Sequence, residues 1–157
     1  MNAIDQIEVV KFTPETRHHF EELNREWIER YFQMEQRDEF VLANPEEAIL
    51  EFGGHIFYAK CNDQIIGTCA LVLVDEYTFE ISKMAVKTEF QGRGVGKALM
   101  EHVIDMARKL RARQLVLYSN SELKTAIAMY RKFGFREVPK LDFHSRRANL
   151  KMSLTLR

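Results

Sequence analysis

The sequence predicts a single α/β domain in which helices flank a mixed, mostly antiparallel sheet. Its 157 residues match the commonest size of a domain with one core. Apolar residues make up 46% and charged residues 29%, with seven Gly and three Pro, which excludes a disordered or collagen-like protein. The chain begins with helical periodicity, continues with strand-like runs and ends with a mixture of both. It contains no repeat and no linker. We therefore expect residues 1–157 to form one domain.

The first third of the chain predicts two acidic helices. Residues 16–36 carry apolar side chains at helical spacing with charges between them, which predicts an amphipathic helix. A second, short helix is expected from Asn44, which can cap it, because Pro45 suits the first helical position. The apolar residues of the first helix are Phe20, Leu23, Trp27, Ile28, Tyr31 and Phe32.

Three consecutive antiparallel strands are expected after Gly53-Gly54. The runs from His55 to Cys61 and from Gln64 to Val74 are rich in β-branched and aromatic residues. Asn62-Asp63 between them is typical of a hairpin turn. A further turn at Asp75-Glu76 leads into a third strand, from Tyr77 to Val86.

The remaining elements alternate between helix and strand. Apolar residues from Val95 to Leu110 form one helical stripe. A buried strand over Gln114 to Tyr118 precedes a helix over Glu122 to Phe133, which ends at Gly134. Two closing strands are expected over Phe135 to Val138 and Ala148 to Leu156.

Between the third strand and the long helix lies a glycine-dense loop, Gln91-Gly92-Arg93-Gly94-Val95-Gly96-Lys97. Missing side chains let the backbone approach a ligand, and free amides at a helix start favour an anion, especially phosphate. A phosphorylated ligand is one interpretation, and a glycine turn that simply enters a helix is the other. The spacing is that of neither the Gly-x-Lys-Ser/Thr loop nor a dinucleotide-binding unit.

At these residues the sequence resembles the GNAT superfamily of acetyltransferases, whose pattern Gln/Arg-x-x-Gly-x-Gly/Ala is met by Gln91, Gly94 and Gly96. Three further segments agree in order and spacing, so that the resemblance spans about residues 77–136. They are Met84-Ala85-Val86, like the family's central strand, Ala126-Ile127-Ala128-Met129-Tyr130, like its later cofactor helix, and Phe133-Gly134-Phe135, like the ending of that helix.

The resemblance implies a GNAT-like fold in which a V-shaped splay between the strands ending at Val86 and Tyr118 forms a cleft for acetyl-CoA, the cosubstrate. The first strand would hold the pantetheine arm and the glycine loop the pyrophosphate. Leu123 departs from the family, because many relatives have Asn there, and this leaves the role of Asn120 open. The expected cofactor-binding residues are Met84, Ala85, Val86, Gln91, Gly92, Arg93, Gly94, Val95, Gly96, Lys97, Asn120, Lys124 and Ala126.

Two residues are expected to handle protons. By resemblance, Tyr130 is the general acid toward the departing sulfur, and a phenol is protonated at neutral pH. Glu80 corresponds to the catalytic glutamate of the histone-acetylating branch, and would remove a proton from the acceptor amine directly or through water. The alternatives are that Tyr130 packs on the helix seam and that Glu80 pairs with Lys83 or a nearby Arg.

Charge is unevenly distributed, although the net charge is zero. Residues 1–52 contain thirteen Asp or Glu and five Lys or Arg, whereas residues 53–157 contain ten and eighteen. The basic part would meet the anionic cofactor and the acidic part a cationic amine. Substrate recognition is expected from Trp27, Tyr31 and Glu35, together with Asp38, although an aromatic stripe is more often core.

Late in the chain, His144 is a candidate for the mouth of the acceptor site, and a solvated loop is its alternative. Arg146 and Arg147 could bind a substrate carboxylate, which would favour amino acids or peptides as acceptors. The segment from Asn24 to Gly54 also resembles acetyltransferase domains that are fused to winged-helix regulators.

The predicted function is an acetyl-CoA-dependent N-acetyltransferase, which moves the acetyl group directly to a primary amine of a small molecule, an amino acid or a peptide. Neither Cys61 nor Cys69 has the setting of a nucleophile. The alternative is a noncatalytic acyl-CoA-binding module that regulates a partner.

Other classes of partner and site are not expected. Zero net charge argues against a nucleic-acid partner, and the absence of an apolar run of about eighteen residues argues against a membrane. The opening Met1 to Asp5 does not resemble a signal peptide, which favours the cytoplasm. No metal is expected, because neighbouring His18 and His19 should point apart on a helix without a third ligand. A homodimer is an oligomeric state that the sequence leaves open.

Overall fold

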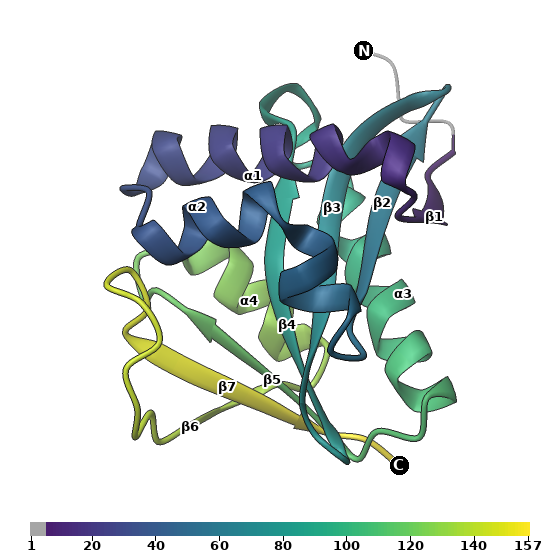
Figure 1. Ribbon diagram of the computed structural model, residues 1–157. Helices are drawn as coiled ribbons and strands as arrows, with labels where there is room; N and C mark the ends of the chain where they lie inside the picture. Colours follow the sequence, from purple (N-terminus) through teal and green to yellow (C-terminus); the bar gives the residue numbers. More distant parts are fainter. Residues whose placement is uncertain (1–5) are drawn as a thin grey trace.

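The strands form one seven-stranded sheet, shown in Figure 1 in a computed structural model that describes residues 6–157. The strand order is β1-β2-β3-β4-β5-β7-β6, and only β4 and β5 run parallel among the paired neighbours described. The predicted mixed, mostly antiparallel sheet is thus confirmed. Met1 to Asp5, on which the expectation about a signal peptide depends, lie outside the described residues.

The central meander follows the sequence prediction closely. β2 (His55–Cys61), β3 (Gln64–Asp75) and β4 (Thr78–Val86) are consecutive antiparallel strands. The turn between β2 and β3 places Asn62 and Asp63 at positive φ, 49° and 64°, as expected for an Asn-Asp hairpin turn.

The first two helices differ from their prediction. α1 (Arg17–Tyr31) follows a short 3-10 turn (Pro14–Thr16), and Phe32 is extended. A separate helix, α2 (Gln36–Ala43), comes next. The expectation of one helix over residues 16–36 is therefore wrong at its end, and α2 was not predicted. The helix expected from Asn44 is a π-helical turn (Glu46–Leu50) capped by Pro45.

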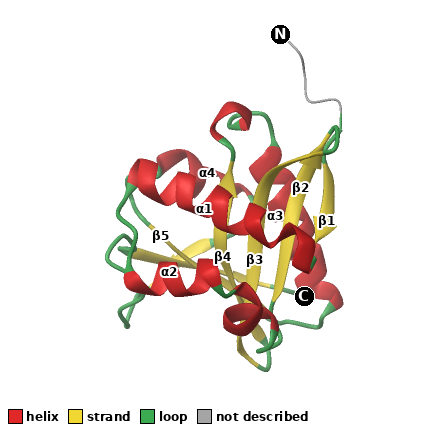
Figure 2. Ribbon diagram, turned by 45° about the horizontal axis from the view of Figure 1, so that its top comes forward, coloured by secondary structure: helices red, strands yellow, loops and turns green. Residues whose placement is uncertain are grey.

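Helices cover both faces of the sheet (Figure 1 and Figure 2). α1 and α2 lie on one face, where Phe20, Val41 and Leu42 are buried against Ile56 and Tyr58. α3 (Val95–Lys109) and α4 (Lys124–Lys132) lie on the other. Each large apolar side chain buried in this way contributes about 1.5–3 kcal/mol. The buried stripe of α3 is Val95, Leu99, Met100, Val103, Ile104 and Ala107.

The C-terminal strands complete the sheet. β5 (Gln114–Ser119) pairs with β7 (Leu150–Thr155), which in turn pairs with β6 (Arg136–Val138). On the opposite edge lies a four-residue strand, β1 (Glu8–Lys11), which was not predicted.

β4 bends where it leaves β5, and this bend opens the sheet. Their pairing runs from Thr78↔Gln114 to Ile81↔Leu117 and then stops, although both strands continue. On the other side of β4, the register shifts between Thr68↔Ala85 and Ala70↔Ser82. Two residues of β4 there oppose one of β3, and one of them, Lys83, has a φ of 54°. Such a bulge bends its strand, so the predicted splay has a local cause.

Other features bear on the sequence expectations. Cys61 and Cys69 are free and buried, as predicted. The rings of His18 and His19 lie 4.0 Å apart, so the expectation that they point apart is wrong. Within residues 6–157, no His, Cys, Asp and Glu side chains form a group of three that could hold a metal. Among the described helices, none has both the length and the apolarity to cross a bilayer.

Candidate functional site

The splay between β4 and β5 opens into a cleft of about 600 Å³. Its walls come from β4, the end of β5, the start of α3, one face of α4, the end of α1 and the loop between β6 and β7. The predicted cofactor-binding residues that line it are Met84, Ala85, Val86, Gln91, Gly92, Gly94, Val95, Gly96, Lys97, Asn120 and Ala126. Segments that are far apart in the sequence therefore meet in one place.

The glycine-rich loop presents unpaired amides to this cleft. Gly92 and Gly94 have φ of 75° and 86°, a conformation that glycine adopts without steric cost. A Cβ on either glycine would meet nothing within 4 Å, so backbone conformation rather than crowding requires glycine here. Within residues 6–157, the amides from Gly92 to Lys97 donate to no backbone carbonyl. Amides left free at the start of a helix attract anions.

Arg93 and Lys124 are the two predicted cofactor-binding residues that stand outside the cleft lining. The guanidinium of Arg93 lies 5.6 Å from the ring centroid of Phe90. Lys124 is the exposed first residue of α4. Lys97, by contrast, lines the cleft beside the free amides.

Beyond Ile81, β4 has a free edge toward the cleft, because pairing with β5 has ended. Met84, Ala85 and Val86 lie on this stretch. The side-chain amide of Gln91 donates to the carbonyl of Val86 at 3.2 Å and so ties the glycine loop to the strand. An unpaired strand edge can pair with an extended, amide-containing ligand.

Tyr130 lines the cleft from α4 and packs on Phe135, with ring centroids 6.1 Å apart. Among residues 6–157, none bonds its hydroxyl, and no buried polar side-chain atom lacks a partner. The hydroxyl therefore reaches the surface of the cleft. Burial of the ring raises the pKa of Tyr130 to about 12, so the phenol keeps its proton at neutral pH.

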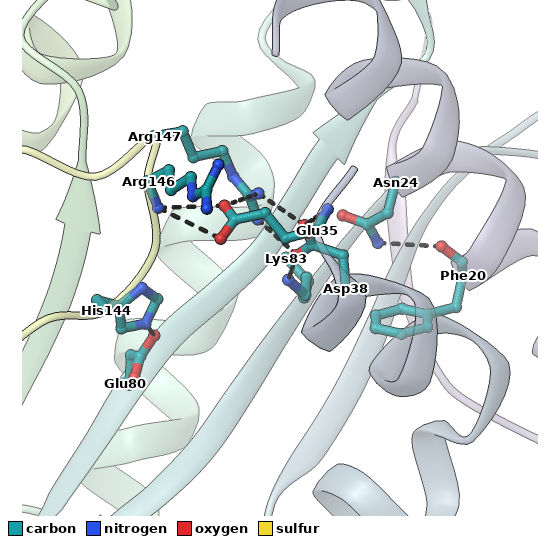
Figure 3. Close-up of polar contacts among 9 residues, drawn as sticks. All are labelled: Phe20, Asn24, Glu35, Asp38, Glu80, Lys83, His144, Arg146 and Arg147. Carbon is teal, nitrogen blue, oxygen red and sulfur yellow. Dashed lines mark hydrogen bonds and ion pairs between the residues drawn. The ribbon is translucent and has the colours of Figure 1, made fainter. Parts of the chain in front are cut away.

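Glu80 also lines the cleft, and its partner comes from the β6–β7 loop. Oε2 of Glu80 lies 2.8 Å from Nε2 of His144 (Figure 3). The imidazole stacks on Tyr118, with ring centroids 4.0 Å apart and an interplanar angle of 17°. The sequence alternative that Glu80 pairs with Lys83 or an Arg is not what the structure shows. His144 lines the cleft, which was one of the two alternatives for this residue, and its contact with Glu80 was not predicted.

The predicted substrate-binding residues are only partly brought together. Trp27 and Tyr31 line the cleft, with ring centroids 5.6 Å apart. Glu35 does not join them, because α1 ends at Tyr31 and the chain turns away. Its carboxylate instead accepts hydrogen bonds from the amide of Arg146 and the guanidinium of Arg147.

Asp38, also considered for substrate recognition, is buried in an ion-pair cluster (Figure 3). Arg147 contacts both of its oxygens at 2.7 Å, and Nζ of Lys83 lies 2.7 Å from Oδ1. Burial alone would raise the pKa of Asp38, but the hydrogen bonds from Arg147 and Lys83 outweigh it and hold that pKa well below its usual range. Asp38 and Arg147 are thus occupied with each other rather than free for a substrate.

Asn120 follows β5 at the edge of the cleft, and both ends of its side-chain amide are engaged. Nδ2 donates to the carbonyl of Arg147 at 2.7 Å, and Oδ1 accepts from the amide of Glu122 at 2.9 Å. This side chain holds the β6–β7 loop against the end of β5.

The arrangement fits a long ligand that carries phosphates at one end and a reactive group at the other. Free amides lie at the start of α3, and the open edge of β4 leads from them toward Glu80. A protonated phenol and a carboxylate–imidazole pair line the same cleft. Acetyl-CoA, with its pyrophosphate, amide-containing arm and thioester, has these properties, and transfer of an acyl group to an amine needs such proton-handling groups.

Comparison with known proteins agrees with the geometry. The model of the acetyltransferase (GNAT) family matches residues 17–135. A GNAT acetyltransferase from Staphylococcus aureus superposes with a TM-score of 0.85 at 22% identity, covering 97% of this chain and 100% of that one. YncA, a putative acetyltransferase from Salmonella typhimurium solved with acetyl-CoA, gives 0.76 at 19% identity, covering 96% and 94%. These likenesses establish the fold.

Curated relatives match over part of the chain. YvbK, an uncharacterized N-acetyltransferase from Bacillus subtilis, is 30% identical over 102 residues, which are 63% of this chain and 66% of that protein. The ribosomal protein bS18-alanine N-acetyltransferase of Escherichia coli is 38% identical over 66 residues, 42% of this chain and 43% of that protein. In both, the match spans less than two thirds of the relative's own length.

Proposed function

Because the chain belongs to the GNAT family of acetyltransferases, we propose that it is an N-acetyltransferase that moves the acetyl group of acetyl-CoA directly to a primary amine of a small molecule, an amino acid or a peptide. One observation carries the proposal: the free edge of β4 and the unpaired amides of the glycine loop line one continuous cleft. The neighbouring cavity beside Asp38 is smaller, at about 120 Å³.

In this proposal the start of α3 and the open edge of β4 bind acetyl-CoA, which supplies the acetyl group as a thioester. The amides from Gly92 to Lys97 neutralise the pyrophosphate, and Lys97 adds a positive charge. Met84 and Val86 orient the pantetheine arm along the strand. All three residues line the cleft, which supports the assignment.

Tyr130 donates its proton to the sulfur as the thioester breaks. Its hydroxyl reaches the cleft, and a pKa of about 12 keeps it protonated. Glu80 assists removal of a proton from the amine. A lysine-like amine needs such help, since its deprotonation at neutral pH costs about 4–5 kcal/mol.

Direct transfer is favoured over an acetylated enzyme. Cys61 and Cys69 are both buried, and burial raises the pKa of Cys69 to about 12. A thiol must ionise to become a good nucleophile. The noncatalytic module is not favoured as an alternative, because Glu80 and Tyr130 are both held at an open cleft.

Primary amines as acceptors agree with the names of similar proteins. One relative acts on an alanine of ribosomal protein bS18, and a chimera derived from spermidine N-acetyltransferase shares the fold. The aromatic pair Trp27 and Tyr31 offers a face for an ammonium group or an apolar side chain. We further propose a cytoplasmic enzyme, alone or as a homodimer, without nucleic-acid or membrane partners.

The test is acetyl transfer from isotopically labelled acetyl-CoA to a library of amines and peptides, followed by mass spectrometry. An enzyme yields labelled amide and free CoA in equal amounts. Binding of acetyl-CoA without any labelled product across the library would instead favour the noncatalytic module.

A further inference from the structure

We propose that His144 is a catalytic residue of this transfer: its imidazole takes the proton of the acceptor amine, and Glu80 orients and balances the ring. The inference rests on the proposed function and deepens it, because it assigns proton removal to a group on the β6–β7 loop rather than to the strand carboxylate alone. It also makes that loop part of the active site.

The geometry of the pair is well defined. Nε2 of His144 lies 2.8 Å from Oε2 of Glu80, and the two side chains are 33% and 14% exposed. Both residues line the cleft. Tyr118 stacks on the face of the imidazole at 4.0 Å between centroids. Figure 3 shows the contact of the ring with Glu80. A ring held at one edge by a carboxylate and on one face by a phenol has a defined orientation.

The hydrogen bond to Glu80 determines which nitrogen is available. An ionised carboxylate only accepts hydrogen bonds, so Nε2 of a neutral His144 carries the hydrogen that it donates to Glu80. Nδ1 then holds the free lone pair. Among residues 6–157, none bonds to Nδ1, and His144 faces the cleft where an amine would approach. The ring can therefore act as a base through Nδ1, the nitrogen that does not contact Glu80.

The loop that carries His144 is anchored just after it in the sequence, at Arg146 and Arg147. The amide of Arg146 donates to Glu35 at 3.2 Å, and Arg147 makes its paired contacts with Asp38 at 2.7 Å. Asn120 holds the carbonyl of Arg147 at 2.7 Å. The partners of the loop lie in α2, in the segment before α2 and just after β5. The backbone that carries His144 is therefore held in place.

Four charged groups near the ring are paired with one another. Glu35 and Asp38 are paired with Arg147, and Asp38 is paired with Lys83. Within the described chain, Glu80 is the carboxylate bonded to the imidazole. The titratable and charged groups near His144 from all packed elements are Glu35, Arg37, Asp38, Glu80, Lys83, Tyr118, Asp142, Arg147 and Lys151.

The proton balance of the step is complete. The neutral amine nitrogen forms a bond to the acetyl carbonyl carbon, and the bond from that carbon to sulfur breaks. The amine proton moves to Nδ1 of His144, where the carboxylate of Glu80 stabilises the positive ring. Tyr130 gives a proton to the sulfur. Water at the mouth then receives the proton of His144 and restores that of Tyr130, so the enzyme returns to its starting state.

The decisive variants are His144→Gln and Glu80→Gln. Glutamine at position 144 retains a side-chain N–H near Glu80 but cannot take a proton, whereas the Glu80 variant keeps the imidazole. We expect H144Q to lower kcat by about 10²-fold or more, with acetyl-CoA affinity within about twofold of wild type. His18→Gln, which changes an exposed histidine of α1 outside the cleft lining, is the matched control and should keep full activity.

The pH dependence of the rate distinguishes a general base from a residue that only holds the loop in place. With one amine used throughout, the titration of that amine cancels in a ratio of rates. A general base acts only in its unprotonated form, so the ratio of wild-type to H144Q kcat/KM should rise with pH and then level. The E80Q variant should lose activity but retain the pH dependence that is due to His144.

Three results would overturn the role of His144 and leave the proposed function intact. One is near wild-type kcat in H144Q, and another is a loss in H144Q that is the same at every pH, which would make the residue a structural support. A pH dependence lost in E80Q but kept in H144Q would likewise assign the base to Glu80. If the wild-type protein acetylates no amine at all, the proposed function itself fails, and the role of His144 fails with it.

Discussion

Asp38 of α2 and Arg147 of the β6–β7 loop form a bidentate pair, with both N···O distances 2.7 Å. They are separated by 109 residues in the sequence. Nζ of Lys83, at the bulge of β4, lies 2.7 Å from the same carboxylate. One buried acid thus joins the helix beside the cleft, the bent strand and the loop that carries His144.

Asp38→Asn should destabilise the protein. The Asp38 carboxylate is only 4% exposed and Arg147 is 17% exposed. Removal of that carboxylate leaves poorly solvated Lys83 without its carboxylate partner and Arg147 with Glu35 alone. We expect a loss of roughly 3 kcal/mol in the free energy of unfolding, measured by urea denaturation at about neutral pH. The matched control is Glu39→Gln in the same helix, whose partner Arg25 forms an exposed pair worth less than about 1 kcal/mol.

The same substitution has a predicted pH signature. The pKa of Asp38 is lower in the folded protein than in the unfolded chain, so its stabilisation is fully present above the unfolded pKa of about 3.9. That stabilisation is lost as the pH falls further, toward the folded pKa. The difference in unfolding free energy between wild type and D38N should therefore shrink below about pH 4. A difference that stays constant on acidification would show that the charge of Asp38 is not responsible.

Gly94→Glu should weaken acetyl-CoA binding by more than about tenfold. It places a negative charge beside the amides that are expected to hold the pyrophosphate. A side chain at a φ of 86° also costs about 1–2 kcal/mol. Gly94→Gln has nearly the same size and backbone cost, so the difference between the two variants isolates the charge. Equal affinities for G94E and G94Q in a calorimetric titration would exclude phosphate from this position.

Tyr130→Phe should reduce kcat by about 10²-fold with little change in acetyl-CoA affinity, since only the hydroxyl is removed. With a pKa of about 12, Tyr130 should not cause a falling limb in the rate below about pH 11. Tyr77→Phe, at an exposed turn before β4, serves as the control. Steady-state kinetics that give wild-type kcat for Y130F would exclude Tyr130 as the acid.

Asn120→Ala distinguishes a cofactor contact from support of the loop. Its two hydrogen bonds hold the backbone of Arg147 and Glu122, so we expect KM for the acceptor to rise by about 2- to 10-fold. Acetyl-CoA affinity should stay near that of wild type, and Asn44→Ala, at the exposed end of α2, should change neither. Weaker acetyl-CoA binding with an unchanged acceptor KM would instead support the cofactor role inferred from family resemblance.

Local patterns predicted the middle of the fold well. β2 has the predicted bounds, because β-branched and aromatic residues and the Asn62-Asp63 turn define it within a few residues. α3 was equally clear from its apolar stripe. By contrast, β1 is a four-residue edge strand with little pattern, and Phe32 continued the helical spacing of α1 although its backbone is extended. The apolar spacing therefore gave no sign that α1 ends before α2 begins.

Of the site, the sequence could predict residues that share one motif but not those that tertiary structure brings together. The glycine loop and the β4 segment were found from local spacing and resemblance. The contact of Glu80 with His144 joins residues 64 positions apart, and Glu35 and Asp38 were expected to face an amine because nothing local indicated Arg147. Such pairs depend on the path of the β6–β7 loop, which no periodicity encodes.

The acyl-CoA site is tested most directly by calorimetric titration of the folded protein with acetyl-CoA, with CoA as competitor. We expect saturable binding of one acetyl-CoA per chain, displaced by CoA and weakened in G94E. No heat with acetyl-CoA and no competition by CoA, from a protein whose fold is verified by circular dichroism, would contradict the proposal that the start of α3 and the open edge of β4 form an acyl-CoA site.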